Sequence, residues 1–191
     1  MAFPLCGNSR LSLMKNPHSP PHLGTRLARP YQSVKSLPVR LFTIGKKRSK
    51  GTQLLVEEYM EKLKSYCSVD DIQLKSNPKH TSDVKAQIDG EDLKIMHHIR
   101  SDDWVVVLDE NGLDIGSEQM AEMVREAGNT GSSTLVFCIG GPYGHGEKLR
   151  KRADVTIRLS SMVLNHQIAL IVLLEQIYRA WTILKGQKYH H

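Results

Sequence analysis

The chain has 191 residues with 26 Lys and Arg, 20 Asp and Glu, and a formal net charge of +6, a length that predicts one domain with an appendage and excludes a large multidomain enzyme. The charge is uneven, because the first acidic residue is Glu57 while residues 1–37 carry five basic ones. The remainder has a net charge of only +1. Overall basicity therefore does not point to a nucleic-acid partner, and such a partner requires a local site.

Residues 1–37 have the composition of an organellar transit peptide. They contain no acidic residue, scattered Arg and Lys, and much Ser and Pro, and they have no apolar run long enough for a secretory signal. We expect this segment to be disordered and to be removed on import into an organelle. The Ser and Pro content favours the chloroplast over the mitochondrion. The alternative is a basic tail that binds polyanions.

From Pro38 onward, short β-branched runs alternate with helical patterns. The first half predicts strands at 39–44, 69–74 and 104–108 and helices at 51–66 and 83–100. The helix at 51–66 should bury the face that carries Leu55, Tyr59, Met60, Leu63 and Tyr66. The apolar strand at 104–108 is typical of the buried centre of a parallel sheet, and we expect it to end at the turn 109–112.

The second half continues the alternation. Ser117 is expected to cap the next helix, and strands at 134–139 and 155–159, a short helix at 147–152 and a final helix at 166–184 follow. The pattern predicts an α/β fold with a mostly parallel sheet.

The final helix has apolar residues on several faces. Because a helix at the end of a small domain buries one face against its own sheet, a second partner is expected, and a homodimer interface supplies it. The alternative is a helix enclosed in the domain core. No run approaches the roughly 18 consecutive apolar residues of a membrane span, so no membrane partner is expected.

Metal and disulfide sites are not expected. The three cysteines, Cys6, Cys67 and Cys138, form no C-x-x-C pair. His97 and His98 are adjacent, so on a helix they diverge by about 100° and cannot share a metal ion as an i, i+4 pair does.

Four glycines gather directly after the strand at 134–139, namely Gly140, Gly141, Gly144 and Gly146. The carboxyl end of a buried parallel strand is where α/β folds bind ligands. The dinucleotide fingerprint and the P-loop both fail at this spacing. A small-ligand loop and an ordinary tight turn both remain open.

Four segments together resemble one enzyme family: LVFCIGGPYG, RLSSMVLNHQ, EQIYRAWTILKG and the terminal KYHH. Over residues 38–191 the chain resembles the ribosomal RNA large-subunit methyltransferase H family of the SPOUT class. The resemblance implies a SPOUT domain at 38–191 with a C-terminal trefoil knot, a homodimer, and S-adenosylmethionine as cofactor. It further implies methylation of a pseudouridine at N-3 in large-subunit ribosomal RNA, free or in the assembled ribosome.

The family resemblance also implies the site residues. The cofactor pocket would comprise Leu108, Gly140, Leu159, Ser160, Ser161, Met162, Val163 and Leu164. The catalytic residues would be His166, Arg179, Tyr189 and His190. Alternatives stay open for each group, because 159–164 could be a plain connection, Arg179 a partner of Glu175 on one helix, and His190 a solvated tail residue.

Three positions depart from many bacterial members of that family. Asn165 stands where Pro is usual, Leu170 where Arg is frequent, and His191 replaces a final Arg or acidic extension. Leu170 and the near-neutral domain motivate the alternative function, a ribosome-associated or RNA-binding protein that has lost catalysis. A nicotinamide or nucleotide enzyme is a third possibility, which the failed glycine fingerprints disfavour.

Overall fold

The computed structural model describes residues 34–76 and 83–188. The expected transit peptide lies almost wholly outside this part, as do the candidate residues Tyr189 and His190. The described elements are β1 (Val39–Ile44), α1 (Lys50–Leu63), β2 (Val69–Leu74), α2 (Val84–Met96), β3 (Asp103–Asp114), α3 (Ser117–Asn129), β4 (Thr134–Ile139), α4 (Glu147–Arg152), β5 (Val155–Arg158) and α5 (His166–Leu184).

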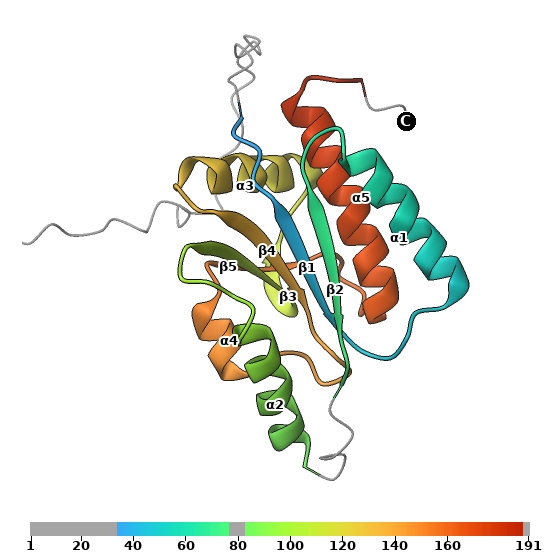
Figure 1. Cartoon of the computed structure of the whole chain (residues 1–191), viewed down its shortest axis with the longest axis vertical. Helices are drawn as coiled ribbons and strands as arrows, with labels where there is room; N and C mark the ends of the chain where they lie inside the picture. The colour runs from blue at the N-terminus through green and yellow to red at the C-terminus, as the bar shows by residue number, and fades with distance from the viewer. Residues whose placement is uncertain (1–33, 77–82, 189–191) are drawn as a thin grey trace, which may run out of the picture. The chain divides into compact units, whose positions relative to one another are not determined.

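The strands form one parallel sheet in the order β2-β1-β4-β3-β5 (Figure 1). This confirms the predicted α/β class with a parallel sheet. Strand order alone does not decide how the chain is threaded, so the trefoil knot stays a prediction.

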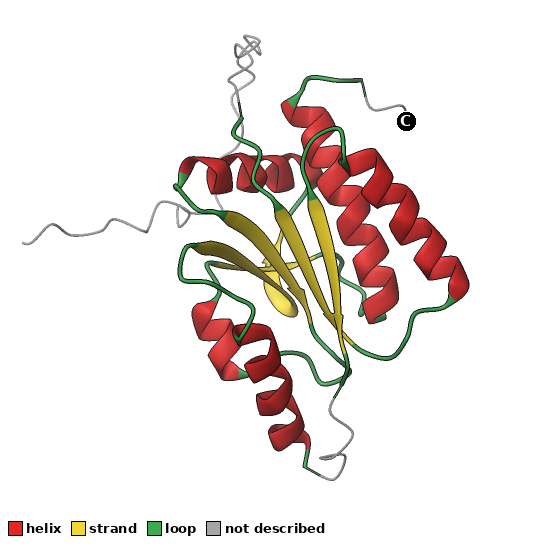
Figure 2. Cartoon of the chain, in the orientation of Figure 1, coloured by secondary structure: helices red, strands yellow, loops and turns green. Residues whose placement is uncertain are grey.

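Helices cover both faces of the sheet (Figure 2). One core lies between the sheet and α1, α3 and α5, and the other lies under α2 and α4. All six residues of β4 are buried, because its side chains alternate between these two cores. This explains why the strand reads as a continuous apolar run.

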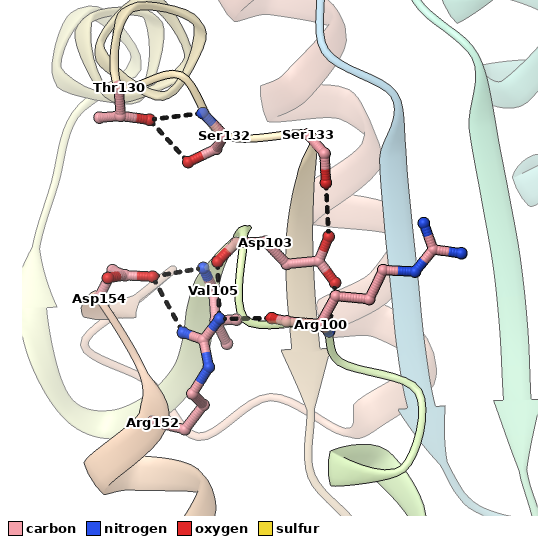
Figure 3. Close-up of polar contacts among 8 residues, drawn as sticks. All are labelled: Arg100, Asp103, Val105, Thr130, Ser132, Ser133, Arg152 and Asp154. Carbon is pink, nitrogen blue, oxygen red and sulfur yellow. Dashed lines mark hydrogen bonds and ion pairs between the residues drawn. The ribbon is translucent and has the colours of Figure 1, made fainter.

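The amino-terminal edge of the sheet is fastened by polar contacts (Figure 3). The Arg152 guanidinium donates to the carbonyl oxygens of Arg100 and Asp103 at 2.8 and 2.7 Å. The Asp154 carboxylate accepts the Val105 N–H at 2.9 Å, and Ser133 donates to the Asp103 carboxylate at 3.2 Å. These bonds join the starts of β3, β4 and β5.

Three local predictions are wrong. β3 does not end at Leu108 but continues to Asp114, because its pairing with β5 resumes after an irregularity between Leu108 and Leu113. On the predicted inner face of α1 only Leu55 is misplaced: it is 42% exposed and Val56 is buried instead, whereas Leu63 is buried and Tyr59, Met60 and Tyr66 pack against the core as expected. The cap of α3 is Gly116, whose N–H donates to Gln119 Oε1 at 2.7 Å.

The apolar helix α5 packs largely within its own chain. Seven of its apolar residues are buried against the sheet and neighbouring helices: Ala169, Leu170, Leu173, Leu174, Ile177, Ala180 and Trp181. Among the described helices, α5 is the one with the length and apolar composition of a membrane span. Packing in the core, against α1 and α3, accounts for most of that composition.

The close approach of β3 and β5 generates a stability prediction. A Cβ placed on Gly112 would lie 2.4 Å from the backbone carbonyl carbon of Ile157, so Gly112→Ala should displace β5 and lower the free energy of unfolding by about 1–3 kcal/mol. Gly51→Ala is the control, because no atom lies within 4 Å of its added Cβ and a helical Ala should stabilise by about 0.5–1 kcal/mol. Urea unfolding measures both changes. Equal stability of the two variants would contradict the packing described.

Candidate functional site

A cavity of about 600 Å³ opens at the carboxyl-terminal edge of the sheet. Its walls are formed by the middle of β3 (Leu108, Asp109 and Glu110), by the ends of β4 and β5 with the loops that follow these two strands, and by the start of α5. Its apolar side chains are Leu108, Ile139, Ile157, Leu159, Met162, Val163, Leu164 and Ala169. This is the edge at which parallel α/β sheets bind ligands, and the volume lies within the roughly 300–1,000 Å³ typical of ligand pockets.

The structure brings most of the sequence-predicted pocket residues to this cavity. Seven of the eight line it, namely Leu108, Gly140, Leu159, Ser160, Met162, Val163 and Leu164. Ser161 lies in the same loop but not in the wall. Of the predicted catalytic residues, His166 lines the cavity and Arg179 does not.

The glycine-rich loop after β4 folds back on itself beside the cavity. The Gly144 N–H donates to the Gly141 carbonyl oxygen at 3.1 Å, and Gly144 has a φ of +74°, a value that favours glycine. A Cβ on Gly140 would lie 2.9 Å from the Gly144 carbonyl group. The loop is therefore a tight turn that also forms part of the cavity wall.

A buried carboxylate from α2 holds the end of this loop. The Asp92 side chain accepts the Gly146 N–H at 3.0 Å and the Leu149 N–H at 3.1 Å, and Asp92 is 1% exposed. These N–H groups lie at the start of α4 and have no acceptor within the helix, and a negative charge at this position stabilises the helix. Asp92 thus fixes the loop from the face of the sheet opposite α5.

An ion pair in the cavity wall joins β3 to α4. Arg150 Nη2 lies 2.6 Å from Asp109 Oδ2, and Arg150 Nε donates to the His145 carbonyl oxygen at 3.1 Å. Asp109 and Glu110 belong to the irregular stretch of β3 that the sequence predicted as a turn. Sequence reasoning missed this pair, although a carboxylate directly after an apolar strand was the available signal.

His166 is the first residue of α5 and borders the cavity. Its Nε2 atom is buried without a hydrogen-bond partner and lies 2.8 Å from the position a Cβ would take on Gly45. Burial, followed by the positive charge of Arg48, lowers the pKa of His166 below its usual 6.5. The imidazole is therefore neutral at physiological pH, the state in which one ring nitrogen can accept a proton.

Arg179 lies far from the cavity of its own chain. It is 13 residues after His166 on one helix, which places it about 20 Å farther along the axis. Its Nε and Nη2 donate to Glu175 Oε1 at 3.0 and 2.7 Å, so the expected i, i+4 ion pair is present. Beyond α5, Gln187 accepts a hydrogen bond from the hydroxyl of Tyr66 at the far end of α1.

Two departures from the bacterial pattern have structural reasons. Asn165 caps α5, because its Oδ1 accepts the Gln167 N–H at 2.9 Å, a bond that a proline side chain could not make. Leu170 is 1% exposed in the core shared by α5 and the sheet. Asn165 lines the cavity, whereas Leu170 lies outside its wall.

Metal ligands do not gather in the described part of the chain, where no three His, Cys, Asp or Glu side chains form a candidate cluster. Cys67 and Cys138 are buried free thiols. The polar groups of the cavity are instead the carboxylates of Asp109 and Glu110, the guanidinium groups of Arg150 and Arg158, and loop backbone groups around an apolar lining. That combination suits an organic ligand with apolar and charged parts.

Residues 37–190 match a family described as "Predicted SPOUT methyltransferase". The chain belongs to the SPOUT methyltransferase family. It is 64% identical over 160 residues to an Arabidopsis thaliana protein provisionally named as an RNA methyltransferase, covering 84% of this chain and 83% of that protein.

Bacterial relatives align over nearly their whole length. The ribosomal RNA large subunit methyltransferase H of Christiangramia forsetii is 38% identical over 157 residues, 81% of this chain and 99% of that protein. Its namesake from Clostridium kluyveri is 35% identical over 156 residues, 80% of this chain and 98% of that protein. The methyltransferase class expected from the sequence is thereby confirmed.

The environment of His166 generates a pH prediction. A histidine NMR titration should give its pKa below 6.5, and Arg48→Gln should raise that pKa because a positive charge is removed beside it. Arg48→Lys, which keeps the charge, is the matched control. Because the pKa of His166 is lower in the folded state than in the unfolded state, the unfolded state binds a proton more readily. The free energy of unfolding should therefore fall as the pH drops from 6.5 to the lowered pKa of the folded state. A measured pKa at or above 6.5 would contradict this environment.

Proposed function

We propose that this protein uses S-adenosylmethionine to methylate N-3 of a pseudouridine in large-subunit ribosomal RNA of an organelle. The observation that carries the proposal is the cavity that brings together seven residues implied for the cofactor and His166. The near full-length match to bacterial enzymes named for large-subunit ribosomal RNA supports the substrate class.

The residues of the cavity fit the proposed cofactor. Apolar side chains such as Leu108 and Leu164 suit its adenine ring, while the exposed Glu110 carboxylate offers negative charge to its sulfonium and amino groups. The Gly140–Gly141 backbone permits close approach because it carries no side chain. When bound, S-adenosylmethionine supplies an electrophilic methyl group.

The proposed acceptor, N-3 of a pseudouridine, carries a proton that must leave. His166, neutral at physiological pH and at the cavity wall, is the residue of this chain best placed to take that proton. Cationic groups such as Arg179 or a protonated His190 would stabilise the negative charge that develops on the base. Tyr189 would help to position the base beside them.

A second copy of the chain would complete the site. Eighteen residues separate His166 from Leu184, or about 27 Å of helix, and the three residues from Gln187 to His190 span at most about 11 Å. We therefore propose that Tyr189 and His190 of one chain act in the cavity of its partner. We propose a homodimer through the exposed side of α5 and the loop before it, where Ile168 is 49%, Met162 72% and Val163 83% exposed.

The leader supports the proposed location. Its acid-free, Ser- and Pro-rich composition fits import into an organelle, with the chloroplast favoured over the mitochondrion. The trefoil knot is part of the same proposal. One argument for an inactive binding protein was the presence of Leu170. That argument is weaker because Leu170 is buried in the core and does not block the cavity.

Mass spectrometry of organellar large-subunit ribosomal RNA tests the activity. RNA from cells lacking the protein should contain an unmethylated pseudouridine that the purified protein methylates in vitro. Unchanged methylation in those cells would contradict the proposed enzymatic activity and favour the alternative of an RNA-binding protein without catalysis.

Single variants should separate cofactor binding from turnover. Gly140→Val should abolish S-adenosylmethionine binding in calorimetry, because its side chain meets the Gly144 backbone and distorts the loop. Arg179→Ala and His190→Ala should bind cofactor normally and lose roughly 30- to 1,000-fold in rate, the effect of removing about 2–4 kcal/mol of charge stabilisation. Normal turnover in either Ala variant would remove that residue from the site.

The dimer is tested at an exposed position. Ile168→Glu should shift sedimentation toward the monomer without lowering the free energy of unfolding of one chain. Leu174→Glu is the comparison, because Leu174 is fully buried within the chain and a charge there should unfold it. A monomeric wild-type protein would end the proposal.

A further inference from the structure

We propose that the β1–α1 loop, residues 45–50, is a binding surface for the phosphate backbone of the RNA strand whose nucleotide enters the cavity. The inference deepens the proposed function and rests on it. The loop has the sequence GKKRSK and joins the carboxyl end of β1 to the start of α1.

The loop concentrates unneutralised positive charge in a domain that is otherwise nearly neutral. Lys46, Lys47 and Lys50 are exposed, and none of them forms an ion pair with a carboxylate in residues 34–76 or 83–188. Three exposed lysines elsewhere lie in ion pairs with nearby glutamates, namely Lys62 with Glu58, Lys64 with Glu61 and Lys151 with Glu147. Three free ammonium groups within five residues form the local site that overall charge could not indicate.

A buried arginine holds the loop in place. Arg48 is 9% exposed and donates to both oxygens of Asp71 on β2, the longer bond being 2.7 Å, and to Thr43 Oγ1 at 2.7 Å. The residue that points inward thus anchors the backbone between lysines that face solvent. A surface ordered in advance binds with a smaller entropic loss.

The end of the loop is fixed to α5. The Ser49 side chain caps α1 by accepting the Thr52 N–H, and the Ser49 N–H donates to Gln167 Oε1 at 3.2 Å. Capped or not, the start of a 14-residue helix carries partial positive charge, which adds to the attraction for phosphate.

The loop and the cavity share a wall. Gly45, the first residue of the loop, packs against the His166 ring, and His166 borders the cavity. An RNA strand that places a base in the cavity beside His166 therefore has its neighbouring phosphates within reach of the loop. Phosphate is the chemistry that a row of ammonium groups fits, and base-edge contacts are not implied.

The salt dependence of RNA binding tests the proposal. The full-length protein is titrated with an organellar large-subunit ribosomal RNA transcript at several KCl concentrations. Lys46→Gln/Lys47→Gln should reduce the slope of log K against log salt by about 1.4–1.8, since each lost phosphate contact removes about 0.7–0.9. Its affinity for S-adenosylmethionine should be unchanged.

Two further variants make the test specific. Lys62→Gln/Lys64→Gln removes the same charge at the other end of α1 and should keep the wild-type slope. Lys46→Arg/Lys47→Arg keeps the positive charge and should also keep the wild-type slope. An unchanged slope in the Lys46/Lys47 glutamine variant, or an equal fall in both glutamine variants, would overturn the inference while leaving a methylating enzyme intact. A wild-type protein that neither binds nor methylates the RNA would overturn both proposals.

Discussion

Burial of β4 on both faces is the constraint on which the rest of the site depends. Its six residues are fully enclosed between two layers of helices, so the chain can emerge from it only at the edge of the sheet. There the Gly140–Gly146 loop turns back sharply and Asp92 fixes its end. Because β5 ends beside this loop and β3 passes it at residues 108–110, the loops after β4 and β5 meet the middle of β3 around one cavity.

The length of α5 is the second constraint. The helix starts at the cavity with His166 and ends at the opposite edge of the sheet (Figure 1). It is packed along its inner face, so Arg179 lies about 20 Å along the helix from His166 and away from the cavity of its own chain. Arg179 is thus separated from the proposed cofactor residues within one chain, and the proposed second subunit would supply the missing catalytic groups.

Sequence patterns predicted the elements well where burial is simple. The bounds of β1, β2 and β4 agree with the expected ones, because β1 and β4 are short, mostly apolar runs and β2, with the sequence VDDIQL, stops before an Asn-Pro turn signal. The continuation of β3 past Asp109 depends on pairing with β5, and the choice between Leu55 and Val56 on α1 depends on packing. The hydrophobic periodicity of the sequence gives no information on either of these points. The cavity residues came from family resemblance, whereas the Arg150–Asp109 pair and the Arg48 anchor required coordinates.

The central claim is that one chain supplies the cofactor loop and its partner supplies the catalytic tail. The most direct measurement is methylation by purified mixed dimers of a Gly140→Val chain and a His190→Ala chain, each inactive by itself. The account predicts that activity returns, because one site in every mixed dimer combines an intact loop with an intact tail. Mixed dimers that stay inactive would contradict it.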